Sequence, residues 1–307
     1  MAVAILLSSC VSLKASDLDS TITIIGKWPK SSAKKFEITR CLDKSNSKDG
    51  RFLHQCSIAS VKVTIEDSTH SGYVIDWLYD NITLDDSYNS ASPVTKYITQ
   101  ITKGMTIKFL TDSVGTFKTI SNWDDIKTFL TMQADSMHSR LRTTNIETID
   151  AVRNKLLDLI NSKDQLQTVL LQDIQLYFSL YGYTLNYRAP MTYNGFFPNM
   201  FGGDPLPTIG KVALKSIDVK NNTAEVTWHQ QADSAQEKQL YKKTLDQQAI
   251  TAGKPAPKDD ELPNIKLYDD YYFLFDLNSG WAQKLTYRRT TATDKMQQVD
   301  SVEFKVY

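Results

Sequence analysis

The sequence predicts an α+β protein made mainly of antiparallel β-sheet in two halves, with a central helical segment between them. Alternating apolar and polar residues, typical of half-buried strands, recur over residues 21–120 and again over residues 186–307. Between these N-terminal and C-terminal β halves, residues 121–185 change to the periodicity of amphipathic helices. At 307 residues the chain can bury a substantial core, as one large domain or two modest ones.

The N-terminal half contains runs of β-branched and aromatic residues that are broken by Gly, Asn, Asp and Ser. These runs predict strands at residues 36–39, 58–65 and 72–84, followed by shorter ones at 105–109 and 117–120. Alternation along the strand at 72–84 places four large residues on one face, which predicts a strongly aromatic surface: Tyr73, Ile75, Trp77 and Tyr79.

Capping residues predict three helices in the central segment. Asn122 is a suitable N-cap for the first helix, and capping boxes that begin at Thr144 and Ser162 open the other two. Gly182 is a suitable C-cap for the last one. We expect the apolar stripes of these helices to form core.

The C-terminal half begins with residues 190–207, where Pro and Gly recur and predict a loop. Strands are predicted after it at 212–219 and 224–228, and the chain ends in a meander of three strands at 267–277, 281–291 and 299–307. The loop is unusually apolar, because it carries Tyr193, Phe196, Phe197, Met200 and Phe201. These side chains either line a ligand cavity or dock a partner, or they fold back and fill the gap between sheet and helices.

The first residues form the longest apolar run of the chain, but this run is too short for a membrane span, which takes roughly 20 apolar residues. It suits the apolar region of a signal peptide over residues 1–9. The stretch Leu7-Ser8-Ser9-Cys10 resembles the lipobox of bacterial lipoproteins. The resemblance implies cleavage before Cys10 and attachment of fatty acyl chains, such as palmitate, to that cysteine, with residues 10–20 as a tether.

Two further features bear on this lipoprotein hypothesis. No Lys or Arg precedes Cys10, so the positively charged region of a signal peptide is missing, and we expect the true start to lie upstream. The alternative is a frayed apolar N-terminus with a buried cysteine. Val11 follows the cysteine in place of the aspartate that would indicate retention in an inner membrane. We therefore expect an outer-membrane anchor that faces the periplasm.

Cys41 and Cys56 flank a polar, turn-rich stretch. If this stretch is the loop of a hairpin, the two cysteines fall at nearly opposite positions, and we expect a disulfide, which exported proteins can keep. Closing so short a loop would stabilise the fold by about 3 kcal/mol. Two unpaired buried thiols are the alternative. Neither cysteine is predicted to be catalytic, because no histidine or basic residue lies at a diagnostic spacing.

The charge balance excludes one class of function. Lys plus Arg and Asp plus Glu each number 35, so the formal net charge is zero. A nucleic-acid-binding protein needs excess positive charge to neutralise phosphates, so we expect no nucleic-acid partner. The balance also gives no reason for strong attraction to an anionic membrane surface, which leaves lipid on Cys10 as the expected membrane contact.

No motif for catalysis, a metal or a cofactor is recognisable. The histidines fall outside known metal-binding spacings: His54, His70, His138 and His229. Paired carboxylates occur beside predicted turns and helix starts, where they complement backbone donors. The sequence lacks a Gly-x-Ser-x-Gly elbow and a phosphate-binding glycine loop. We expect no cofactor and no catalytic residue.

With its lipobox and terminal meander, the sequence resembles uncharacterised lipoproteins of Bacteroidota-type bacteria. More distantly, it resembles curved half-barrel carriers of lipoprotein and lipid cargo, which implies that the sheet is curved into a half-barrel. We expect a non-enzymatic lipoprotein that binds an apolar ligand or an envelope protein.

Two other functions stay open: a scaffold or accessory subunit of an envelope complex, and an envelope hydrolase. A cavity lined by Trp77, Trp228 and the aromatic loop would favour ligand binding. A flat apolar patch would favour the scaffold, and a polar cleft with two facing carboxylates would favour the hydrolase.

Overall fold

In the computed structural model, strands make up 49% and helices 26% of the residues whose structure is described, so the protein is mainly antiparallel β-sheet with added helices, as the sequence predicts. The structure describes residues 21–47, 50–141, 145–197, 205–233 and 265–307, together with some residues between 238 and 262. The predicted signal peptide, Cys10 and the tether lie outside the described residues.

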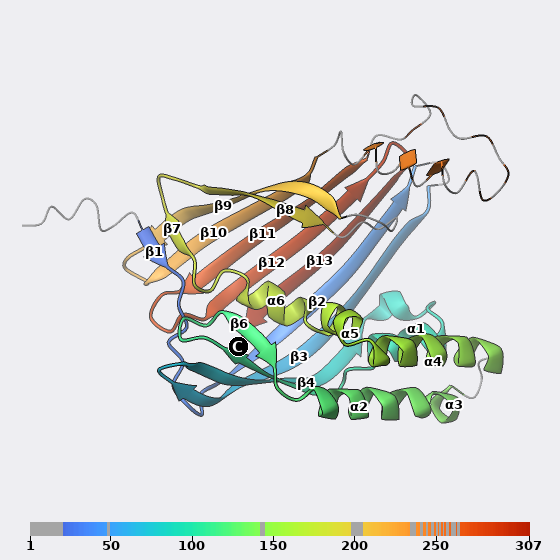
Figure 1. Ribbon diagram of the computed structural model, residues 1–307, viewed down its shortest axis with the longest axis horizontal. Coiled ribbons are helices and arrows are strands. Elements are labelled where there is room, and N and C mark those ends of the chain that lie inside the picture. Colours follow the sequence, from blue (N-terminus) through green and yellow to red (C-terminus); the bar gives the residue numbers. More distant parts are fainter. Residues whose placement is uncertain are drawn as a thin grey trace, which may run out of the picture.

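Among the described residues, one sheet of 11 antiparallel strands forms the body of the protein (Figure 1). Its order is β6-β5-β4-β3-β2-β13-β12-β11-β10-β9-β8, so the two predicted β halves meet where β2 pairs with β13 and form one continuous sheet. The N-terminal half supplies β2 (Ala33–Asn46), β3 (Phe52–Thr69), β4 (Gly72–Leu84), β5 (Thr106–Thr111) and β6 (Phe117–Ile120). The C-terminal half supplies β8 (Met191–Phe197), β9 (Leu206–Asp218), β10 (Thr223–Ala232), β11 (Lys266–Asp276), β12 (Ala282–Ala292) and β13 (Met296–Val306). A separate pair joins β1 (Thr21–Thr23) to β7 (Thr184–Asn186).

The helices follow β6 in the chain and lie against one face of the sheet (Figure 1). They are α2 (Trp123–Asp135), α3 (Met137–Arg140), α4 (Ile146–Asn161), α5 (Lys163–Leu170) and α6 (Gln172–Phe178). A short α1 (Pro93–Thr99) and the 3₁₀ turn η2 (Asp86–Tyr88) lie between β4 and β5. No helix among the described residues has both the length and the apolar character that crossing a membrane requires.

The predicted helix starts are close to the observed ones, but the caps differ. Asn122 precedes α2, yet its side chain accepts from the Lys108 amide and donates to the Thr106 carbonyl, so it ties the helix to β5 instead of capping it. Asn145 caps α4, and Thr144, the predicted cap, lies outside the described residues. Ser162 stands at the N-cap of α5 without a side-chain cap hydrogen bond, so the predicted box does not form.

The prediction of a loop over residues 190–207 is wrong. Residues 191–197 form β8, which pairs with β9 from Met191↔Val212 to Phe197↔Leu206. Exposure alternates along β8, with Tyr193 partly buried, Phe196 exposed and Phe197 buried. Edge position explains why this strand tolerates Pro190 at its start and Gly195 within it, because an edge strand needs only one partner.

The aromatic face predicted for the strand at 72–84 is confirmed and forms the centre of the core. Ile75, Trp77 and Tyr79 on β4 are buried against the helices, and Trp77 packs edge-on against Tyr177 of α6 and Phe304 of β13. The structure buries Trp77 completely, so this indole fills the interior.

Helix α6 is tied to the sheet by polar groups at a spacing of four residues. Asp173, Tyr177 and Tyr181 follow one face of the helix and its extension, because residues four apart lie one above the other. The Tyr177 hydroxyl donates to the Ala282 carbonyl at 2.9 Å, and the Tyr181 hydroxyl donates to the Gly280 carbonyl at 2.6 Å. The helix is therefore fixed in register against the start of β12.

The C-terminal end of the sheet curls toward the helix-covered face. Phe197 of β8 lies with its ring 4.8 Å from the guanidinium carbon of Arg289 on β12, four strands away in the sheet order. In a flat sheet, four steps of about 4.8 Å would separate these strands by roughly 19 Å. The curl therefore brings the edge strand β8 back over the sheet.

The β11–β12 turn supplies a test of this packing. Gly280 has φ +73°, and a Cβ there would lie 2.0 Å from the Ile25 carbonyl oxygen, whereas Gly104 has φ +85° and open space around it. Gly104→Ala should cost about 1 kcal/mol from its backbone conformation alone. Gly280→Ala should cost about 1–3 kcal/mol more from the clash. Guanidinium unfolding measures both, and equal losses would contradict the close approach.

Candidate ligand-binding pocket

A pocket of about 530 Å³ lies between the helices and the C-terminal half of the sheet. Its size falls within the range of roughly 300–1,000 Å³ that is usual for small-molecule sites. Helices α5 and α6 line one side, and the neighbouring strands β2, β13, β12, β11 and β10 line the other. The lining residues are Arg40, Thr168, Gln172, Asp173, Gln175, Leu176, Ser179, Trp228, Tyr271, Tyr287, Arg289, Asp300 and Val302. The lining therefore combines aromatic rings with charged groups.

The first charged pair joins the sheet to α6. Arg40 on β2 donates to Oδ1 of Asp173, and the Tyr79 hydroxyl on β4 donates to Oδ2 at 2.8 Å. Asp173 is almost completely buried, while the Arg40 side chain keeps 37% of its surface exposed. Both oxygens of this buried carboxylate are thus satisfied by protein donors, and the guanidinium still has N–H groups for a ligand.

The second charged pair lies within the sheet. Arg289 on β12 donates two parallel hydrogen bonds to Asp269 on β11, from Nε to Oδ1 at 2.8 Å and from a terminal nitrogen to Oδ2 at 2.7 Å. The hydroxyls of Tyr271 and Tyr287 also donate to Oδ2. Bidentate geometry and burial of Asp269 make this the more rigid of the two pairs.

Both arginines stay charged over the whole physiological pH range. Burial by itself would lower the pKa of Arg289, but the hydrogen bonds and charge of Asp269 outweigh it and raise that pKa above its ordinary value. Asp173 has the same effect on the pKa of Arg40. Burial and the charge of Asp269 raise the pKa values of Tyr271 and Tyr287, so both phenols remain neutral hydrogen-bond donors.

An aromatic wall stands beside these pairs. The rings of Trp228 and Tyr271 stack with centroids 4.3 Å apart and planes 14° apart, and Tyr287 lies 5.0 Å beyond Tyr271. Because Trp228 lies on β10, Tyr271 on β11 and Tyr287 on β12, three neighbouring strands build one continuous row of rings.

A chain of hydrogen bonds fixes Trp228 in place. Its indole N–H donates to the Tyr193 hydroxyl at 2.7 Å, which donates to Gln230, whose amide donates to Thr208 at 2.6 Å. Burial, the main cause, raises the pKa of Tyr193 to about 12, so its hydroxyl keeps its proton. Gly210 is paired with Tyr193 across the strands, and a Cβ there would lie 2.2 Å from the tyrosine ring, so only glycine lets the ring lie flat.

The structure distributes the candidate binding residues over several places. Trp228 lines the pocket, Tyr193 accepts the hydrogen bond of the Trp228 indole, and the ring of Phe197 packs against the Arg289 guanidinium. Phe196 is 68% exposed on the opposite face of β8, and Trp77 lies in the core. Met200 and Phe201 lie outside the described residues.

Sequence reasoning missed the charged residues that line the pocket, which are Arg40, Asp173, Arg289 and Asp300, and it missed Asp269, the partner of Arg289. A signal for some of them is visible in the pattern. Asp269 stands at an inward position between Leu267 and Tyr271, and Asp173 lies among the apolar residues of α6. A charge at a position that the periodicity assigns to the core indicates a buried pair, but the partner is far away in the sequence.

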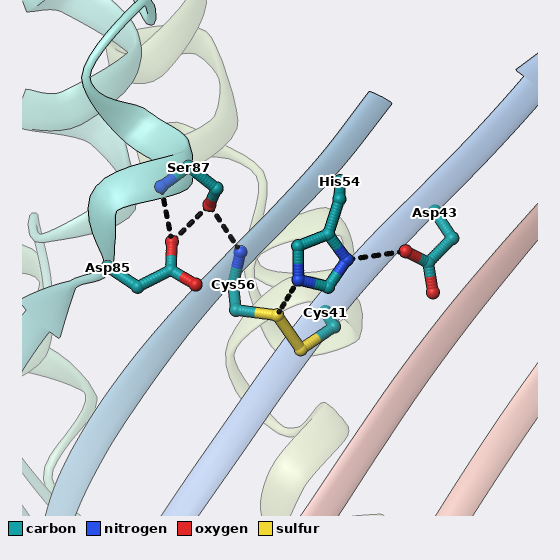
Figure 2. The surroundings of a disulfide bond; sticks show 6 residues. All are labelled: Cys41, Asp43, His54, Cys56, Asp85 and Ser87. Carbon is teal, nitrogen blue, oxygen red and sulfur yellow. Dashed lines mark hydrogen bonds and ion pairs between the residues drawn. A yellow bond between two sulfur atoms is a disulfide. The ribbon is translucent and has the colours of Figure 1, made fainter. Parts of the chain in front are cut away.

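The predicted disulfide between Cys41 and Cys56 is present (Figure 2). The two residues are directly opposite on β2 and β3, with Cα atoms 4.2 Å apart. The sequence shows no histidine at a diagnostic spacing from the cysteines, yet in the structure Nε2 of His54 lies 3.2 Å from Sγ of Cys56. The contact forms because His54 and Cys56 are two residues apart on β3, so their side chains lie on the same face of the sheet.

Comparison with known proteins gives no assignment: no protein-family model matches the sequence, and no curated protein matches it.

Breaking the rigid ion pair should strongly destabilise the protein. Asp269→Asn leaves Arg289 without its counter-charge in a largely buried site, and we expect a loss of about 3–5 kcal/mol in the free energy of unfolding. Asp270→Asn is the matched control, because Asp270 is the next residue along the strand, is half-exposed and pairs with His229 on the other face of the sheet. That control should change stability by less than about 0.5 kcal/mol in guanidinium titrations. Similar losses for the two variants would contradict the structural role of Asp269.

Proposed function

We propose that the protein is an exported lipoprotein that binds a small neutral ligand with a ring-shaped, hydroxylated body, a sugar being the class that fits best. The pocket carries this proposal, because it combines the aromatic row of Trp228, Tyr271 and Tyr287 with the two arginine–aspartate pairs. The role is binding and not catalysis.

Charge in the pocket argues for a neutral ligand. Arg40 and Arg289 are each neutralised by an aspartate, and Asp300 adds a further carboxylate to the lining. An anion would find no uncompensated positive charge. A hydroxyl group both donates and accepts, so it can bond to the remaining guanidinium N–H groups on one side and to oxygen acceptors on the other. The aromatic row offers an apolar surface for the carbon face of a ring.

A wholly apolar ligand fits this lining less well. It would remove Arg40, Gln172 and Asp300 from water without replacing their hydrogen bonds, and unpaired buried polar groups are costly. Hydrolysis by the pocket carboxylates is also disfavoured. Asp173 and Asp300 are the carboxylates in the described lining, and both oxygens of Asp173 are engaged by protein donors. Asp300 therefore has no second free carboxylate in that lining to complete a hydrolytic pair.

The proposed setting is the outer membrane, with acyl chains on Cys10 and the folded part facing the periplasm. The disulfide supports export, because such bonds persist in oxidising compartments. The sheet would act as a curved half-barrel. Its curled C-terminal end and helix α6 form the two sides of a trough, and the contact of Phe197 with Arg289 supports that shape.

Removing the indole should weaken ligand binding. Isothermal titration calorimetry with maltose, cellobiose and diacetylchitobiose should detect binding of at least one disaccharide. Trp228→Ala should weaken it by about tenfold, because one aromatic stacking surface is lost. His229→Ala is the control, since its half-exposed ring lies on the opposite face of the same strand.

A second probe separates the polar ligand class from the apolar one expected from the sequence. The apolar probe is phenylnaphthylamine. If it binds, if palmitate displaces it and if Trp228→Ala abolishes its binding while none of the sugars binds, then the ligand is apolar and the sugar proposal fails. Absence of binding by every probe would also contradict a sugar site.

The anchor is tested separately. Cells that express the full-length gene should incorporate labelled palmitate into the protein, and Cys10→Ser should abolish the label, because the thiol that carries the acyl chain is gone. The Cys41→Ser, Cys56→Ser double variant should keep the label. Label that persists in Cys10→Ser would overturn the anchor assignment.

A further inference from the structure

A second cluster of chemically active side chains surrounds the Cys41–Cys56 disulfide (Figure 2). It lies on the opposite face of the sheet from the pocket. Because side chains alternate along a strand, Arg40 points toward α6 and its neighbour Cys41 points away from it. Two cross-strand pairs follow one another on this outer face of β2 and β3: Cys41 with Cys56, and Asp43 with His54. The cluster takes no part in the proposed ligand site.

Three candidate donor atoms lie close together, and the distance between one sulfur and the imidazole nitrogen is near that of a metal site. Sγ of Cys41, Sγ of Cys56 and a ring nitrogen of His54 all lie within 4.8 Å of one another, and Sγ of Cys56 is 3.2 Å from Nε2 of His54. A tetrahedral zinc ion, with bonds of about 2.3 Å to sulfur and about 2.0 Å to nitrogen, would hold those two atoms about 3.5 Å apart. Once the disulfide is open, both thiolates remain on one face within reach of the same ion.

The imidazole is already oriented for such a role. Nδ1 of His54 lies 2.6 Å from Oδ1 of Asp43, and since an ionised carboxylate only accepts, Nδ1 carries the proton. The lone pair of the neutral ring is then on Nε2, which faces the sulfur. A carboxylate that holds the far nitrogen of a histidine is the usual outer partner of a zinc-bound imidazole.

The surroundings leave one side of the cluster open. Cys56 is mostly buried, and its backbone amide donates to the hydroxyl of Ser87 in η2. The backbone amide of Ser87 donates in turn to the carboxylate of Asp85. The His54 side chain is 47% exposed and gives access from solvent. Three protein ligands with an open fourth position, filled by water, are a known arrangement for zinc.

We propose that the reduced form of the protein binds one zinc ion through Cys41, Cys56 and His54, with Asp43 as the outer partner of the histidine. A dithiol reductant transfers two electrons and two protons to the Cys41–Cys56 bond and itself becomes a disulfide. Zinc then displaces the two thiol protons and bonds to both sulfurs and to Nε2. The disulfide and the metal exclude each other, so the redox state selects between them.

The test uses the full chain with Cys10→Ser in every variant, so that no third thiol contributes. A phosphine reductant opens the disulfide under anaerobic conditions and leaves as the phosphine oxide. Circular dichroism confirms that the reduced protein is folded, and Zn²⁺ is titrated against a fluorescent chelator. Co²⁺ serves as a spectroscopic substitute, because sulfur ligands give it near-ultraviolet charge-transfer bands.

We expect one zinc ion per reduced chain and none per oxidised chain. His54→Ala should abolish stoichiometric binding, and Asp43→Asn, which keeps all three ligands, should weaken it by about 10- to 100-fold. His229→Ala is the matched control, because His229 and Asp270 form the same cross-strand pair at 2.7 Å without cysteines beside them. Reduced protein that binds no zinc, or His54→Ala protein that binds it as tightly as His229→Ala, would overturn the site.

Discussion

The buried carboxylate of Asp173 is the constraint on which the arrangement of sheet and helices depends. A charge taken out of water is tolerated only where it is paired and hydrogen-bonded, and Arg40 and Tyr79 supply those bonds from two different strands. Helix α6 can therefore occupy only one position along the sheet. Tyr177 on the helix bonds to the start of β12, and Tyr181 just after the helix bonds to the β11–β12 turn, so three polar anchors act on α6 and the turn that follows it.

The position of α6 determines the pocket. Asp173 lies in both the anchor and the lining, so the contact that seats the helix also sets one side of the cavity. The opposite side is held by bonds within the sheet, from the Arg289–Asp269 pair and from the Trp228–Tyr193 hydrogen bond. Because these groups are already bound to one another, the pocket is formed before any ligand arrives. Such pre-organisation reduces the entropy that binding has to overcome.

The parts of the fold that could be predicted from sequence are those set by local pattern. The inward face of β4 follows from alternation alone, and the Cys41–Cys56 pairing follows from two cysteines placed symmetrically about a hairpin turn. Strand β8 was missed because its Pro and Gly punctuation is also typical of loops, and only pairing with β9 distinguishes the two. The Arg40–Asp173 pair spans 133 residues, and no local periodicity contains a contact of that range.

Adjacent residues of β2 serve two separate chemical environments, and this follows from the pleat of the strand. Arg40 is committed to the pocket side and Cys41 to the outer face, so chemistry at the cysteines does not enter the pocket. Yet a link between Cys41 and Cys56 holds β2 and β3 in register, and register decides which face every side chain of β2 occupies. A zinc ion bound by Cys41, Cys56 and His54 would join the same two strands at the same pair of positions. Arg40 would therefore keep its bond to Asp173 in either state, and the ligand pocket would survive exchange of the disulfide for the metal.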